Sequence, residues 1–241
     1  MNGHTYRNPP IVEAVFEVQF SEPLSGRDLD RLRERFINRY PKVDQQYQVD
    51  VEINPDGRAT TKAAPIGFRM TSSNALDTVT LQHQRFGTSR MAPYEGWEKF
   101  VSTVSANYDE FTKIAGRRTL TRIASRYINR LDIPTEELEG VDVLQFLRFG
   151  VAMPDEMSKS IGPFSVAANF SVDEVKVLAQ CAVIAPALLN HLSFLFDIDA
   201  FIDKDISPHK DAIWAVAERL HQVKNHVFEA GITDRLRERF K

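Results

Sequence analysis

The segment from Ile11 to Phe20 alternates between two kinds of side chain along its length. Apolar residues occupy every second position, at Val12, Ala14, Phe16, Val18 and Phe20. Between them lie Glu13, Glu17 and Gln19. Because successive side chains of a strand point to opposite faces, this pattern predicts a half-buried β-strand. A sheet built around this strand needs a second layer of structure on its apolar face.

The remainder of the first half predicts a helix, three strands and a second helix. Ser25 can cap the first helix, whose apolar residues recur at helical spacing from Leu29 to Tyr40. Turn sequences separate three strand candidates at residues 47–53, 66–71 and 78–86. A long amphipathic helix follows, from Trp97 to Ala115. The predicted order over residues 1–116 is therefore βαβββα.

The same order of patterns returns in residues 117–241. A strand is predicted at residues 119–131, a short helix at 141–147, and strands at 164–170, 177–184 and 192–201. A long helix begins near Pro208 and carries Trp214 beside its apolar stripe; Gly231 should end it, and Thr233 can cap a short last helix. The order of the predicted elements is similar in the two halves, although the residues themselves match less well. This shared order predicts an internal duplication.

Two βαβββα halves side by side predict an α+β fold in one compact unit. We expect antiparallel sheet covered on one face by the two long helices. The uncovered face is then the natural binding surface.

Charge and composition restrict the class of partner. The 241 residues include 30 basic and 33 acidic side chains, for a net charge of -3, so a nucleic acid could bind only at a local basic patch and is not favoured. The single Cys181 cannot form an internal disulfide, and the apolar run around it is too short to span a bilayer. No signal-like segment opens the sequence. We expect a cytoplasmic protein with no membrane contact.

Three arginines give the clearest functional signal. Arg122, Arg126 and Arg130 recur at every fourth position of a predicted strand, so they share one face, and Ile123, Tyr127 and Leu131 lie on the other. The planar, permanently charged guanidinium suits phosphate or carboxylate, and three of them in a row would line a groove for an extended anion.

The acidic residues of the first strand offer a second interpretation of these arginines. Glu13 and Glu17 share the polar face of that strand and could form cross-strand ion pairs if the two strands are neighbours. Both interpretations bring the same candidate ligand-binding residues together: Arg122, Arg126, Arg130, Glu13 and Glu17. They differ in whether the guanidinium groups are open to a ligand.

Other reactive residues form no recognisable set. His83 could carry a proton but has no evident orienting partner, and His221 and His226 do not share one face of a helix. Asp197 and Asp199 could hold a cation or could pair with arginine, and Asp155, Glu174 and Lys176 resemble a nuclease pattern only weakly. Zinc, phosphate-loop and serine-hydrolase motifs do not occur. We expect no cofactor and no bound metal.

Three segments carry a resemblance: YRNPPIVEAVFEVQF, RIASRYINRLDIP and VFEAGITDRLRERF. At these segments the chain resembles a sporadically distributed prokaryotic family of conserved hypothetical proteins, over nearly its full length. The resemblance implies no activity, cofactor or catalytic residue. A sporadic distribution suggests an accessory gene set, in which defence, toxin control and regulation are common.

Two functions follow from these observations. The first is a non-enzymatic binding or regulatory module that holds a protein partner or an anionic ligand on the open sheet face. The alternative is an enzyme acting on a phosphorylated or nucleic-acid substrate through the arginine-lined groove, with Glu13, Glu17 or His83 as the proton carrier. An enzyme needs a concave pocket with convergent polar groups, whereas a binding module would show a broad groove or an apolar patch.

Overall fold

The computed structural model describes residues 6–54, 57, 59–137, 143–151, 163–204 and 206–241. Nine strands and four α-helices form in these residues, in the order β1 (Ile11–Phe20), α1 (Gly26–Phe36), β2 (Lys42–Ile53), β3 (Ala59–Thr71), β4 (Asp77–Gln82), β5 (Arg85–Met91), α2 (Trp97–Ala115), β6 (Leu120–Pro134), β7 (Ser165–Val172), β8 (Val175–Ile184), β9 (His191–Ile202), α3 (Lys210–Gly231) and α4 (Asp234–Arg237). Short 3-10 helices occupy Thr135–Glu137, Val143–Gln145 and Glu238–Phe240.

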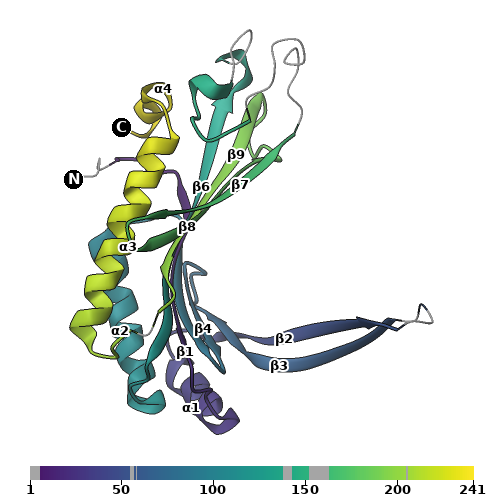
Figure 1. Ribbon diagram of the computed structural model, residues 1–241, viewed down its shortest axis with the longest axis vertical. Coiled ribbons are helices and arrows are strands. Elements are labelled where there is room, and N and C mark those ends of the chain that lie inside the picture. The colour runs from purple at the N-terminus through teal and green to yellow at the C-terminus, as the bar shows by residue number, and fades with distance from the viewer. Residues whose placement is uncertain (1–5, 55–56, 58, 138–142, 152–162, 205) are drawn as a thin grey trace.

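All nine strands belong to one antiparallel sheet. Its order is β2-β3-β4-β5-β1-β6-β9-β8-β7, which places β1 and β6 side by side near the middle (Figure 1). The expected bounds of the first strand are confirmed, and Ala14, Phe16, Val18 and Phe20 are all buried. The chain is thus a mixed fold of helices and strands around a large antiparallel sheet.

The prediction of one strand at residues 78–86 is wrong, because the chain reverses direction within this segment. His83 and Gln84 form a two-residue turn between β4 and β5, and Gln82 pairs with Arg85 across that turn. Val79, Leu81 and Phe86 nevertheless lie in the core. His83 and Gln84 are not among the Gly, Asn or Pro residues that are typical of hairpin turns, so no turn signal divides this segment.

The two halves share an order of strands but differ in detail. Outward from the central pair the order is β5-β4-β3-β2 on one side and β9-β8-β7 on the other. The first half has an extra strand, and only Val143–Gln145, a 3-10 turn, occurs in the described part of the predicted helix at 141–147. Internal duplication therefore stays a prediction.

Both long helices lie on the same side of the sheet in Figure 1. Aromatic contacts connect each helix to the sheet: the ring of Phe111 in α2 lies 4.6 Å from that of Phe86, and Trp214 in α3 lies 5.6 Å from Phe16. The helix ends follow the sequence. Ser25 caps α1 by accepting from the Asp28 amide, and Thr233 caps α4 by accepting from the Leu236 amide.

Strands β2 and β3 continue past the core as a two-stranded arm, which we define as residues 47–53 and 59–65. Both figures show this arm reaching away from the body of the molecule. Tyr47, Val49 and Val51 follow each other on one face of the arm and are 58%, 56% and 61% exposed. Their partners across the ladder are Pro65, Ala63 and Thr61.

Within the described residues, no helix is long and apolar enough to cross a membrane. Cys181 is a buried free thiol in β8, and its burial raises the pKa of the thiol to about 11.

Candidate functional site

The predicted arginines lie on the sheet face opposite the helices. Strand β1 pairs with β6, and the register sets Gln19 opposite Arg122 and Val15 opposite Arg126. The alternate residues Ile123, Tyr127 and Leu131 are fully buried on the helix side. The expected proximity of the two strands is therefore observed. We call this surface the open face.

Each of the three arginines on the open face already forms an ion pair with a carboxylate. Arg122 binds Glu17 at 3.2 Å and Asp199 at 2.7 Å. Arg126 donates from Nε to both oxygens of Asp197, at 2.9 and 3.1 Å. Arg130 binds Asp132 at 3.1 Å and donates to the Ser193 hydroxyl at 3.2 Å.

The two predicted acidic residues, Glu17 and Glu13, differ in their ion pairs. Glu17 joins Arg122 and also Arg85, at 3.4 Å, whereas the ion pair that the structure gives Glu13 is a distant one with Arg69, at 3.9 Å. Burial raises the pKa of Asp199, opposed by Arg122. Asp197 and Asp199 thus pair with arginines, and no group of three metal-binding side chains occurs in the described residues.

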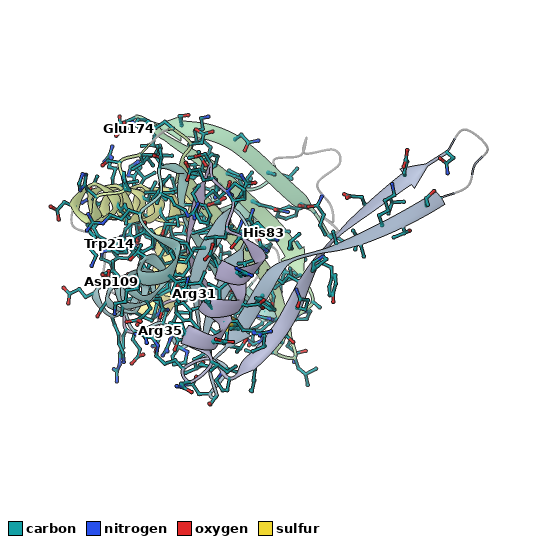
Figure 2. All side chains as sticks on the ribbon, turned by 90° about the horizontal axis from the view of Figure 1, so that it is seen from below. Arg31, Arg35, His83, Asp109, Glu174 and Trp214 are labelled. Carbon is teal, nitrogen blue, oxygen red and sulfur yellow. The ribbon has the colours of Figure 1, made fainter. Side chains whose placement is uncertain are left out.

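His83 and the nuclease-like residues do not come together. The His83 ring lies in the β4–β5 turn with Nδ1 2.8 Å from the Leu24 carbonyl oxygen, so this nitrogen is used in holding the turn. Figure 2 shows His83 toward the base of the arm and Glu174 on the other side of the molecule. Glu174 pairs with Lys204 at 2.8 Å, and Asp155 lies outside the described residues.

A pocket on the helix side of the sheet is the stronger candidate site. It has a volume of about 510 Å³ and lies between the segment Tyr6–Ile11, the loop that leads into α2, and the last turns of α3. Helical spacing explains the contribution of α3, because residues three or four apart share a face. Positions 221, 224, 225 and 228 follow that spacing, and all four line the pocket. We call it the Lys224 pocket.

Lys224 is the unusual residue of this pocket. Lys224 is only 5% exposed, and its Nζ lies 3.8 Å from the centroid of the Tyr127 ring. Among the described residues no hydrogen bond or ion pair of Nζ is formed. Burial lowers the pKa of the ammonium to about 7, opposed by the charge of Glu229.

The two carboxylates that line the pocket already have partners. Glu229 accepts from the Tyr6 hydroxyl and binds Arg237 at 2.8 Å. Glu95 binds Arg90 at 2.6 Å and also pairs with Lys99. The positive charge of Lys224 therefore has no dedicated counter-ion in the described part of the chain.

His221 supplies a second unsatisfied group beside Lys224. Its ring stacks on Trp97 with centroids 4.3 Å apart and an interplanar angle of 8°. Asn225 Nδ2 lies 3.0 Å from His221 Nε2, which assigns the proton to Nδ1, and Nδ1 is buried without a partner. Burial and the Lys224 charge lower the pKa of His221 to about 3, so the ring is neutral.

Two tyrosine hydroxyls and Arg7, from the N-terminal segment, also belong to the site. The Tyr94 and Tyr127 oxygens are 3.2 Å apart, and burial raises the pKa of Tyr94 to about 12, so its hydroxyl keeps its proton. Arg7 lines the pocket and is exposed, and its guanidinium forms no ion pair or hydrogen bond within the described residues. The pocket therefore combines two cations with aromatic walls.

Sequence reasoning missed this pocket, although one signal for Lys224 was present. Leu220, Lys224 and Phe228 follow each other four residues apart along the buried side of α3. A lysine in the register of an apolar stripe must be buried or must snorkel to the surface. The rest of the pocket has no local signal, because its walls come from segments that are far apart in the sequence.

The three segments that carry the resemblance meet around the Lys224 pocket. The first contributes Tyr6, Arg7, Pro9, Pro10 and Ile11, the second Asn129, and the third Phe228 and Glu229. Comparison with protein-family models and with curated proteins finds no match for this chain.

Proposed function

We propose that this protein is a non-enzymatic binding module that holds a small anionic ligand in the Lys224 pocket. The observation that carries the proposal is the buried ammonium of Lys224 without a counter-ion. An unpaired buried charge costs several kcal/mol even after relaxation of its surroundings, which an anion in the pocket would offset. Arg7 offers a second cation at the same pocket.

Aromatic walls favour a ligand with a planar apolar body. Tyr94, Trp97 and Phe228 line the pocket, and its volume of about 510 Å³ lies within the range of small-molecule sites. Mostly apolar walls with a few convergent polar groups are typical of such sites. We therefore expect an aromatic or alicyclic acid rather than a bare inorganic ion.

A protein partner on the open face is the second candidate, and Arg126 favours it. Its side chain is 49% exposed, against 20% for Arg122 and 25% for Arg130. The enzymatic alternative, in which the arginines clamp a phosphorylated substrate, has less support because their carboxylate partners would have to be displaced.

The proposal also includes a biological role, a cellular compartment and an internal duplication. A regulatory role in an accessory gene set agrees with the sporadic distribution of the family that the chain resembles, and a reducing compartment such as the cytoplasm agrees with a buried free thiol at Cys181. An internal duplication is supported by the shared order of strands outward from β1 and β6.

The test compares benzoate with benzamide, a neutral molecule of nearly the same shape, by calorimetric titration. We expect benzoate to bind at least about tenfold more tightly, which corresponds to about 1.4 kcal/mol. Lys224→Met, an apolar replacement of similar length, should remove this preference, and Arg7→Ala should weaken it without disturbing the core.

Arg126→Ala is the matched control on the open face, measured at a temperature where the variant is folded. It should leave the preference for benzoate unchanged. Loss of benzoate binding in Arg126→Ala but not in Lys224→Met would contradict the pocket and support the open face. Equal affinity of the native protein for benzoate and benzamide would contradict an anionic ligand.

A further inference from the structure

We propose that the Lys224 amine binds carbonyl compounds covalently, as an imine, inside the Lys224 pocket. The ligand class is an organic acid that also carries an aldehyde or a ketone. This inference rests on the proposed function, because the same pocket must first admit the acid.

The position of the amine suits a nucleophile. Lys224 lies on the buried side of the 22-residue helix α3, and its amine packs over the Tyr127 ring. The residue also lines a pocket that is large enough for a small molecule. No carboxylate of the described residues ties it up in an ion pair. An amine that is desolvated in an apolar pocket is the usual arrangement for imine-forming lysines.

Burial leaves the Lys224 amine partly neutral near pH 7, and the polar and titratable groups that face it do not restore its charge. They are Tyr127 and Asn129 from β6, Tyr94 and Glu95 from the loop before α2, His221, Asn225 and Glu229 from α3, and Tyr6 and Arg7 from the N-terminal segment. His221 is uncharged, and both carboxylates have other partners. With a pKa of about 7, roughly half of the Lys224 amine is unprotonated at that pH.

The proposed step balances without a further reactant. The neutral nitrogen attacks the carbonyl carbon, a C–N bond forms, and the π electron pair moves to the oxygen, which takes up a proton. The resulting carbinolamine then loses its oxygen together with the two former amine hydrogens as one water molecule. The proton that the oxygen takes up can be the one that the attacking nitrogen loses, so this step needs no further acid.

The acid group of the ligand fits the other cation of the pocket. Arg7 lies at the exposed side and has no partner within the described residues, so it can pair with a carboxylate while the carbonyl end reaches Lys224. The aromatic walls then enclose the body of the ligand.

Reductive trapping tests this inference on the full chain. The protein is incubated with para-carboxybenzaldehyde and sodium cyanoborohydride, which reduces an imine to a stable secondary amine, and the label is located by peptide mass spectrometry. At pH 7 we expect at least about tenfold more label on Lys224 than on Lys113, an exposed lysine of α2. Labelling of Lys224 should level off above about pH 8, since its amine is then neutral.

Two variants and one matched ligand control the result. Lys224→Met and Lys224→Arg should both abolish the fast labelling, and Arg keeps the positive charge if Met disturbs folding. The alcohol para-(hydroxymethyl)benzoate should bind and protect Lys224 without forming an adduct.

The outcomes separate the two proposals. Trapping confined to Lys224 supports the imine. Binding of benzoate without trapping at Lys224, or labelling spread evenly over the surface lysines, overturns the imine and leaves the anionic ligand in place. Absence of both benzoate binding and trapping overturns both.

Discussion

Arg126 and Asp197 form an unequal ion pair at the centre of the open face. The Arg126 side chain is about half exposed, whereas that of Asp197 is only 10% exposed. The hydrogen bonds that the structure gives the Asp197 carboxylate all come from Arg126. Removing the arginine therefore leaves a nearly buried carboxylate without its donors.

We predict that Arg126→Ala lowers the free energy of unfolding by about 2 kcal/mol. This lies between the cost expected for an exposed pair, about 1 kcal/mol or less, and that for a fully buried one, about 3 kcal/mol or more. Urea unfolding measures the difference. In an Asp197→Asn background the same substitution should cost less than about 1 kcal/mol, because no charge is left unpaired. A cost near zero in the native background would show that the pair contributes nothing.

At the residue scale the sequence predicted the shared face of the three arginines better than it predicted their partners. The spacing of Arg122, Arg126 and Arg130 correctly placed them on one face, and Glu17 does meet Arg122. The strongest partners of Arg126 and Arg122, however, come from β9, some seventy residues away. Strand pairing decides such contacts, and spacing within one segment cannot show it.

The β2–β3 arm is the element with the least support from the rest of the molecule. Both strands of its ladder are exposed from Tyr47 opposite Pro65 to Glu52 opposite Thr60. An isolated two-stranded hairpin is at best marginally stable in water, because its hydrogen bonds are open to solvent and its side chains bury little apolar area.

We predict that backbone amides of residues 48–52 and 60–64 exchange with deuterium at least about a hundredfold faster than those of β1. Strand β1 is the internal reference, since it pairs on both sides and its apolar face is buried. Hydrogen exchange followed by mass spectrometry measures both in one sample. Equal protection would show that another molecule covers the arm in solution.

The elements were predicted best where their two faces differ. Strand β1 and the long helices have a buried and a polar side, so their periodicity is clear. In the arm both faces are exposed, and pairing with β2 extends β3 to 59–71, well beyond the predicted strand at 66–71. Strand β2 also starts before the predicted strand at 47–53 and covers residues 42–53. Hydrogen bonding between neighbours, which leaves no hydrophobic pattern, determines these longer bounds.

On the scale of the whole molecule, the sheet separates two chemistries. Its open face carries arginines that carboxylates already neutralise, and its helix side carries the Lys224 pocket with a cation that lacks a counter-ion. The pocket exists because the N-terminal segment packs along the C-terminal end: Asn8 donates to the Phe240 carbonyl at 3.0 Å, and the Tyr6 ring contacts Phe228 and Phe240. Contacts between the two ends of a chain depend on the complete fold, so the sequence could not reveal this site.

The most direct test of the Lys224 pocket is the pKa of Lys224 itself, measured by NMR from the carbon next to Nζ with and without benzoate. The free protein should show a pKa near 7, and saturating benzoate should raise it by more than about one unit, because the anion favours the protonated amine. By linkage, the affinity for benzoate should fall as the pH rises above about 7 and the amine loses its charge. Benzamide should leave the pKa unchanged. A Lys224 pKa near 10.4 in the free protein, or one that saturating benzoate does not move, would contradict a buried cation waiting for an anionic ligand.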